Sequence, residues 1–227
     1  MSPRLSIVIP ALDEAAGIGA TLAALAPLRA AGHELIVVDG GSRDGTPVAA
    51  QPLADRVLVA ARGRAGQMNA GAGAASGHVL VFLHADTRLP AGADRAVLDG
   101  LAASGTSWGR FDVRIEGRSP LLALVAWLMN RRSRLTGIAT GDQAMFVTRA
   151  AFAAVGGFPA LALMEDIALS KRLKRVSPPL CLRTRIVTSG RRWESRGVVR
   201  TIVLMWWLRL RYFLGASPEH LRRIYYG

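Results

Sequence analysis

Residues 34–46 constrain the fold of this 227-residue chain more than any other stretch. Residues 35–38 are a continuous apolar run rich in β-branched side chains, which is typical of a strand buried on both faces of a parallel sheet. The run ends at Asp39, and the glycines and polar residues that follow predict a turn. Open α/β sheets bind ligands at the carboxyl ends of their strands, so Asp39 is a candidate binding residue. A turn that binds nothing is the alternative.

A second carboxylate follows another predicted strand. Residues 5–9 form a first strand that Pro10 ends, and residues 78–83 form the most apolar strand, which precedes Asp86. Strand, helix and strand within about 35 residues is the length of a βαβ unit. Asp39 and Asp86 are therefore expected at one edge of a single sheet. A carboxylate at that edge suits a hard divalent cation that also binds phosphate oxygens.

The remaining pattern predicts an α/β fold with a mostly parallel sheet flanked by helices. Further strands are expected at residues 56–60, 108–116, 144–147 and 180–187, with helices between them. Residues 108–116 alternate apolar and polar side chains, which is typical of a half-exposed strand. We expect one domain over residues 1–190 and a basic, aromatic helical extension over residues 191–227.

The charge and the composition limit the classes of molecule that the chain is expected to bind. The net charge is +13, and the part from Arg183 onward carries ten arginines against two glutamates, a net charge of +8. A basic end of this kind suits nucleic acid, an anionic membrane or a phosphorylated substrate, and a solvated arginine face is the simpler alternative. The single Cys181 excludes an intramolecular disulfide. The N-terminus shows no signal-peptide pattern, which predicts a cytoplasmic location.

Two apolar stretches bear on a membrane. Residues 121–129 are apolar but too short to span a bilayer, which needs ~20 residues. Residues 202–208 include Trp206 and Trp207 among arginines, a pattern that favours a peripheral helix at the inner face of the membrane. Packing on the sheet or in a homodimer are the alternatives. No recognition motif accompanies the basic end, so we expect no nucleic-acid partner.

Polar residues at predicted helix starts supply further candidates. Glu165 and Asp166 begin a helix, where acidic residues are common as caps, but a carboxylate held there can also act as a general base. Arg64 and Asn69 lie in a basic segment rich in small residues, which would let a helix approach a ligand closely. An ordinary basic loop is the alternative.

Together these motifs resemble family 2 glycosyltransferases of the GT-A fold. The resemblance rests on five segments in the family's order, residues 6–14, 38–46, 62–71, 82–86 and 163–166. It covers residues 4 to about 190. The segment Gly141-Asp142-Gln143 and the segment Arg191-Arg192-Trp193 are similar to those of a small bacterial subgroup.

The resemblance implies an inverting transfer of a sugar from a UDP- or GDP-linked donor to an acceptor of unknown kind, including a lipid or lipid-linked one. Asp166 would be the base, supported by Glu165, and Asp86 would hold Mn²⁺ or Mg²⁺. The nucleotide would lie against Pro10, Glu14, Asp39, Arg64 and Asn69. The acceptor or diphosphate side would include Asp142, Gln143, Arg192 and Trp193.

The chain departs from the family pattern at three positions. Gly40 follows Asp39 where relatives often have a second Asp, His84 replaces the first residue of the metal motif Asp-x-Asp, and Ser189 replaces the Gln of Gln-x-x-Arg-Trp. These departures leave a non-catalytic nucleotide-binding module as one alternative. A nucleotidyltransferase is the other, although it would usually carry a glycine-rich basic loop straight after the first strand.

Overall fold

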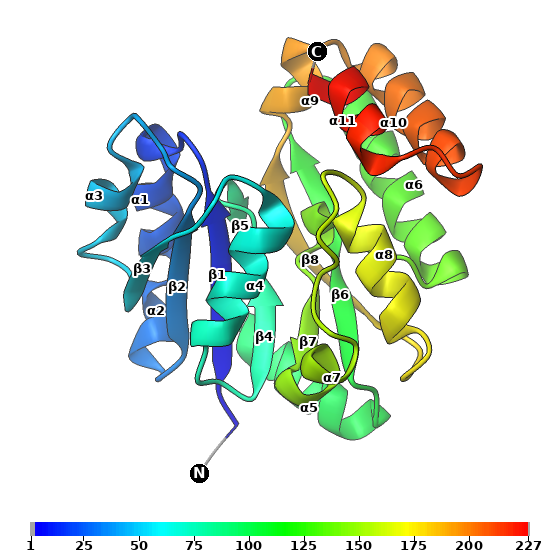
Figure 1. Cartoon of the computed structure of the whole chain (residues 1–227). Coiled ribbons are helices and arrows are strands. Elements are labelled where there is room, and N and C mark those ends of the chain that lie inside the picture. The colour runs from blue at the N-terminus through cyan, green and yellow to red at the C-terminus, as the bar shows by residue number, and fades with distance from the viewer. Residues whose placement is uncertain (1–2, 227) are drawn as a thin grey trace.

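The computed structural model describes residues 3–226, with Tyr226 described by its backbone only. Within this range, eight strands form one sheet in the order β3-β2-β1-β4-β7-β6-β8-β5 (Figure 1). The strands are β1 (Leu5–Ala11), β2 (Glu34–Asp39), β3 (Arg56–Val59), β4 (Val79–Phe82), β5 (Thr87–Arg88), β6 (Trp108–Glu116), β7 (Phe146–Thr148) and β8 (Leu180–Ser189). Strands β1 to β4 are mutually parallel, and β7 runs antiparallel to both β4 and β6. β8 is parallel to β6, and β5 is antiparallel to β8.

Helices cover both faces of the sheet. They are α1 (Ala15–Ala24), α2 (Ala26–Ala30), α3 (Thr46–Ala50), α4 (Arg64–Ala74), α5 (Ala93–Ser104), α6 (Leu121–Thr136), α7 (Arg149–Ala154), α8 (Glu165–Leu173), α9 (Arg191–Ser195), α10 (Val198–Phe213) and α11 (Pro218–Tyr226). A short 3₁₀ helix, η1, spans Gly141–Gln143. Buried side chains of α1, α5 and α6 share one core cluster, and those of α4, α7 and α8 share the cluster on the opposite face.

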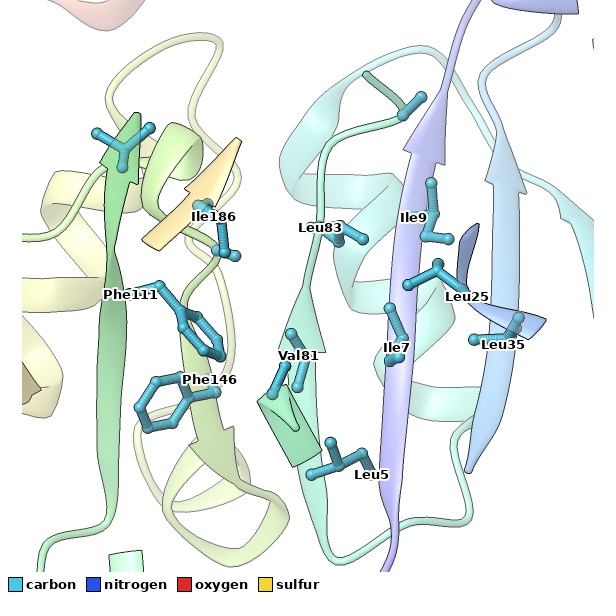
Figure 2. Close-up of a cluster of buried hydrophobic side chains, with 14 of the residues drawn as sticks. Leu5, Ile7, Ile9, Leu25, Leu35, Val81, Leu83, Phe111, Phe146 and Ile186 are labelled. Atoms are coloured by element: carbon cyan, nitrogen blue, oxygen red, sulfur yellow. The ribbon is translucent and has the colours of Figure 1, made fainter. Parts of the chain in front are cut away.

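Strand β2 confirms the prediction of a strand buried on both faces, because Leu35 and Val37 lie in one core cluster and Ile36 and Val38 in the other. Strand β1 is buried in the same way. Leu5, Ile7 and Ile9 point into one cluster, and Val8 points into the other. Figure 2 shows the first three in a row along β1, beside the side chains of the next strand. α4 lies very close to this part of the sheet, because a Cβ on Gly71 would come within 2.4 Å of Val8 Cγ1.

Strand β6 corrects the prediction of a half-exposed strand. Its first six residues are all buried, and only Arg114 and Glu116 are exposed. The strand lies between β7 and β8 and is covered by α6, so polar positions of the alternation face protein instead of water. Arg110 is fully buried and pairs with Asp112, which also binds Arg134 of α6 at 2.8 Å.

Smaller differences concern element ends. β1 continues through Pro10 to Ala11, and β5 was not predicted because it has only two residues. The first predicted helix is divided into α1 and α2 at Leu25. Asp13, which precedes α1 and is of a residue type that commonly caps helices, is not its cap, because its carboxylate accepts the backbone N–H of Arg43.

The C-terminal helices pack on the body of the protein. Leu208 of α10 and Leu221 of α11 are fully buried in a third cluster with Met164 and Ile167 at the start of α8. Figure 1 shows α9, α10 and α11 gathered beside α6 at the upper right. Among the described residues, no helix combines the length and apolarity needed to cross a bilayer.

Candidate active site

A cavity of about 70 Å³ brings together charged residues from six separate segments of the chain. These are Arg64, His84, Asp142, Glu165, Asp166, Arg192 and Arg209. Arg64 is the first residue of α4, and Glu165 and Asp166 are the first two residues of α8. Five of the seven are predicted site residues, whereas His84 is the departure from the metal motif and Arg209 is a new member of the site.

The two neighbouring carboxylates have different environments. Asp166 accepts the backbone N–H of Gly141 at Oδ2 (2.9 Å) and that of Ile167 at Oδ1 (2.7 Å), a geometry suited to a charged carboxylate. Each oxygen keeps a lone pair for a ligand. Glu165 is only 7% exposed, and burial together with the charge of Asp166 raises its pKa to about 7. Glu165 is therefore the member of the pair that takes up a proton, and Asp166 is the available base.

His84 is held by η1. Its Nδ1 lies 3.3 Å from Asp142 Oδ1, and its ring packs so closely that a Cβ on Gly141 would come within 2.5 Å of its Nε2. Partial burial opposes the charge of Asp142, but the hydrogen bond from His84 and the charges of His84 and Arg64 hold the pKa of Asp142 well below its usual range. Asp142 is thus a permanent anion beside the arginines.

Asp86, the predicted metal ligand, has a carboxylate that the described residues leave unbonded. It lies between β4 and β5, is partly buried, and makes no side-chain hydrogen bond or ion pair with residues 3–226. Mg²⁺ is commonly held by one or two carboxylates together with substrate phosphates and water, which this arrangement fits. Within the described residues, no group of three or more His, Cys, Asp or Glu side chains could hold a metal without such help.

Three of the predicted nucleotide residues, Pro10, Glu14 and Asp39, lie at or just after the carboxyl ends of β1 and β2 and outside the lining of the cavity, whereas Arg64 lines it. Asp39 pairs in register with Ala11, but its carboxylate accepts the N–H groups of Gly41 and Ser42 (2.9 Å each) and the Ser42 hydroxyl. One lone pair of Oδ1 is left for a ligand. Pro10 is part of the same edge. Glu14 lies 3.3 Å from Arg191, which links this edge to α9.

Three other predicted residues also lie outside this cavity. Asn69 uses its amide on both backbone groups of Phe158, at 2.9 and 3.0 Å, and so anchors the loop before α8. Gln143 is fully buried and accepts the backbone N–H of Thr140. Trp193 lines a neighbouring cavity instead.

Two residues near the site, Gln67 and Arg209, were not predicted from the sequence. Gln67 donates to the carbonyls of Ala11 (2.9 Å) and Val38 (2.8 Å), and so fixes the strand ends on which Pro10 and Asp39 lie. Arg209 reaches the cavity from α10. A glutamine in a row of small residues, and an arginine within an apolar helix, were the only signals in the sequence.

The arrangement suits the binding of a polyanion next to a base. Arg64, Arg192 and Arg209 place three guanidinium groups on one cavity, and guanidinium binds phosphate oxygens strongly. Asp166 lies among them with free lone pairs, within reach of a hydroxyl proton on a bound molecule.

The chain is similar to known glycosyltransferases. The family model described as Glycosyl transferase family 2 matches residues 6–153. A beta-monoglucosyldiacylglycerol synthase from Synechocystis sp. is 26% identical over 250 residues, covering 96% of this chain and 49% of that protein. A PGL/p-HBAD biosynthesis glycosyltransferase from Mycobacterium bovis is 37% identical over 95 residues, covering 39% of this chain and 37% of that protein. The chain thus spans half or less of the length of these relatives.

Solved structures confirm the predicted GT-A fold. TarS 1-349 from S. aureus, in complex with UDP-GlcNAc, superposes with a TM-score of 0.66 at 14% identity, over 82% of this chain and 58% of that one. The mannosyltransferase PcManGT from Pyrobaculum calidifontis, in complex with GDP-Man and Mn²⁺, gives a TM-score of 0.60 at 22% identity, over 82% and 57%. Because the family model covers more than half of the sequence, the chain belongs to glycosyl transferase family 2.

Proposed function

We propose that the protein transfers a sugar from a UDP- or GDP-linked donor to an acceptor hydroxyl, with inversion at the anomeric carbon. The observation that carries the proposal is the cavity in which Asp166 lies among Arg64, Arg192 and Arg209. The donors bound in the structures of TarS and PcManGT support it. Within the family, we assign the protein to the small bacterial subgroup whose motifs the segments at Asp142 and Trp193 resemble.

The proposed reaction is a single displacement. Asp166 removes the proton of the acceptor hydroxyl as its oxygen bonds to the anomeric carbon, and the bond from that carbon to the diphosphate breaks with its electron pair on the leaving group. Arg64 and Arg192 offset the charge that grows on the diphosphate. Asp166 is the proposed base because each of its oxygens keeps a free lone pair in the cavity, and Glu165, whose pKa is raised to about 7, supports it by being partly protonated at neutral pH.

The proposed donor lies along the carboxyl ends of β1, β2 and β4. Its base and ribose contact Pro10, Glu14 and Asp39, and its diphosphate reaches Asp86 and Arg64. A divalent metal bound there would act as a Lewis acid that stabilises the leaving diphosphate. Asp86 would be its protein ligand, with the remaining positions filled by phosphate oxygens and water.

Thermal unfolding with UDP, GDP and their sugar conjugates, each with and without Mn²⁺, tests donor binding. A ligand at ~100 times its Kd stabilises a protein by about 2.7 kcal/mol. This corresponds to roughly 5–10 °C in Tm for a chain of this size. We expect such a shift with one nucleotide class, larger with Mn²⁺ than without. The absence of any shift would contradict the proposal.

Two variants separate binding from chemistry. Asp86→Asn should lose the Mn²⁺-dependent part of the shift, whereas Asp99→Asn, an exposed carboxylate of α5, should keep it. Asp166→Asn should keep the shift and lose sugar transfer. Full transfer by Asp166→Asn would remove this residue from the mechanism. Nucleotide binding by a wild-type protein that never turns over would favour the non-catalytic module instead.

We also propose peripheral attachment to the inner face of a bacterial membrane through one face of α10. This α10 face consists of apolar side chains that are each 41–62% exposed: Val199, Val203, Trp206, Trp207, Leu210 and Phe213. Arg200 and Arg211 lie beside it and are exposed, which suits anionic lipid. The name of the Synechocystis relative, a synthase of a glucosylated diacylglycerol, supports a lipid acceptor.

Co-sedimentation with phosphatidylglycerol vesicles at low salt tests the attachment. We expect the wild type to bind and the double variant Trp207→Ser/Leu210→Ser to bind at least several-fold less. Val48→Ser is the control, because Val48 is an apolar residue of α3 that is even more exposed (79%). If the wild-type protein does not bind vesicles but forms a dimer through residues of the α10 face, that face is a homodimer contact instead.

A further inference from the structure

A second cavity, of about 170 Å³, lies between α6 and α10. Its apolar walls are formed by Val125, Leu128, Met129, Ile202, Met205 and Trp206. Asp142, Met205 and Arg209 line both this cavity and the candidate active site, so the two spaces adjoin. A molecule bound between α6 and α10 can therefore extend its polar end toward Asp166.

Two arginines in this cavity have buried donors without acceptors. Arg132 Nε and Nη2 and Arg209 Nε are inaccessible to solvent and have no hydrogen-bond partner in the part of the chain that the structure describes. Burial and the nearby charge of Arg209 lower the pKa of Arg132 to about 10, so it stays a cation at neutral pH. Buried cations with unpaired donors are unfavourable, and an anion bound where the two guanidinium groups line the cavity would offset their charge.

On the basis of the function proposed above, we propose that this cavity binds the acceptor, and that the acceptor is an anionic amphiphile. Its phosphate group binds Arg132 and Arg209, its alkyl chain lies along the apolar walls, and a hydroxyl of its head group points to Asp166. The order of these groups along the acceptor follows from the order of their partners along the two adjoining cavities.

The size and the position of the cavity fit one end of an alkyl chain. In other proteins an apolar cavity of about 150 Å³ holds a molecule as large as benzene, so this one accommodates several carbon atoms. Trp206 lines the cavity and is 61% exposed, which connects it to the rest of the α10 face. The remainder of a longer chain can continue along that face into a bilayer.

Arg132 is poorly placed for the donor diphosphate, because it lines only the cavity between α6 and α10. Arg64 and Arg192 line only the active site, and Arg209 lines both spaces. Arg132 is therefore the arginine expected to bind the acceptor phosphate and not the donor.

Calorimetric titration with three matched probes, each below its micelle concentration, tests the proposal. Decanoyl lysophosphatidylglycerol carries a hydroxyl, a phosphate and a chain; monodecanoylglycerol lacks the phosphate; glycerol 3-phosphate lacks the chain. We expect the first probe to bind at least roughly 10-fold more tightly than either of the others. A hydrogen bond to a charged phosphate changes affinity by about 10-fold or more, and so does the burial of a few CH₂ groups.

Variants identify the subsite. Arg132→Gln should weaken lysophosphatidylglycerol roughly 10-fold and leave monodecanoylglycerol nearly unchanged. Leu128→Trp, which fills the cavity, should weaken both chain-bearing probes and leave glycerol 3-phosphate unchanged. Arg131→Gln is the matched control, because Arg131 is the exposed neighbour on α6 and stacks on Trp127. Circular dichroism and Tm verify that each variant is folded.

The outcomes separate this inference from the function on which it rests. Equal affinity for lysophosphatidylglycerol and monodecanoylglycerol, or an unchanged profile in Arg132→Gln, would overturn the anion subsite while nucleotide binding still supports the transferase. An equal loss of UDP or GDP affinity in Arg132→Gln would assign the arginine to the donor and would also overturn it. Failure of every nucleotide to bind would refute the proposed function itself.

Discussion

Replacing Glu165 by glutamine tests the electrostatic division between the two carboxylates. The pKa of Glu165 is raised from 4.5 to about 7 by burial and by the charge of Asp166. In the unfolded chain the group would ionise near its ordinary value. Between these two pKa values the folded protein holds a proton that the unfolded chain has released, so folding becomes less favourable as the pH rises.

The expected size follows from the shift. One pKa unit corresponds to 1.36 kcal/mol, so ionising Glu165 in the folded state costs on the order of 3 kcal/mol. The full penalty applies above about pH 7 and vanishes below about pH 4.5. Glu165→Gln cannot ionise and avoids the penalty. Its stability relative to the wild type should therefore increase by on the order of 3 kcal/mol from acid to mildly alkaline pH.

Urea unfolding of both proteins at about pH 5 and about pH 8 measures this difference. Any constant effect of the amide cancels, because only the change with pH is compared. Glu219→Gln, an exposed glutamate of α11, controls for the loss of one carboxylate. The same stability difference between Glu165→Gln and wild type at both pH values would refute the reasoning. Glu165→Gln should also keep sugar transfer, in contrast to Asp166→Asn.

Two further predictions concern the packing that supports the site. Asp112→Ala leaves the fully buried Arg110 without its anion. The free energy of unfolding, measured in urea, should fall by about 3–5 kcal/mol. A loss below about 1 kcal/mol would contradict the structural role of this ion pair. Gly71→Ala forces α4 away from Val8 and should lower the free energy of unfolding by about 1–3 kcal/mol. It should also lower donor affinity, measured by nucleotide titration, because Arg64 is displaced with α4. An unchanged Tm would contradict the close packing.

Much of the fold was predictable because its signals are local. The β-branched runs at β1, β2 and β4 identify buried strands without reference to the rest of the chain. Strand β6 was not predictable in the same way. Its alternation resembles an exposed strand, and only the coverage by α6 and the ion pair of Arg110 with Asp112 bury its polar positions.

The same contrast between local signals and tertiary contacts applies to the residues of the candidate site. Asp86 and Asp166 follow from motifs whose spacing is written in the chain, and the structure places both with free lone pairs. Asn69 and Gln143 belong to the same motifs, yet their amides are used within the protein. A motif specifies which residue type is present, but not whether its polar atoms are already bonded.

By itself the sequence determined the central buried strands, because hydrophobic runs and turn residues act over a few positions. The order of its motifs determined the membership of a glycosyltransferase family. Only the tertiary structure decided that α10 closes the site, that Glu165 is buried beside an ionised partner, and that Arg132 and Arg209 share a cavity. These features depend on helices α6, α8 and α10 meeting in space. Their contacts bury these side chains and bring charges together from distant parts of the chain. A local sequence pattern cannot predict such contacts.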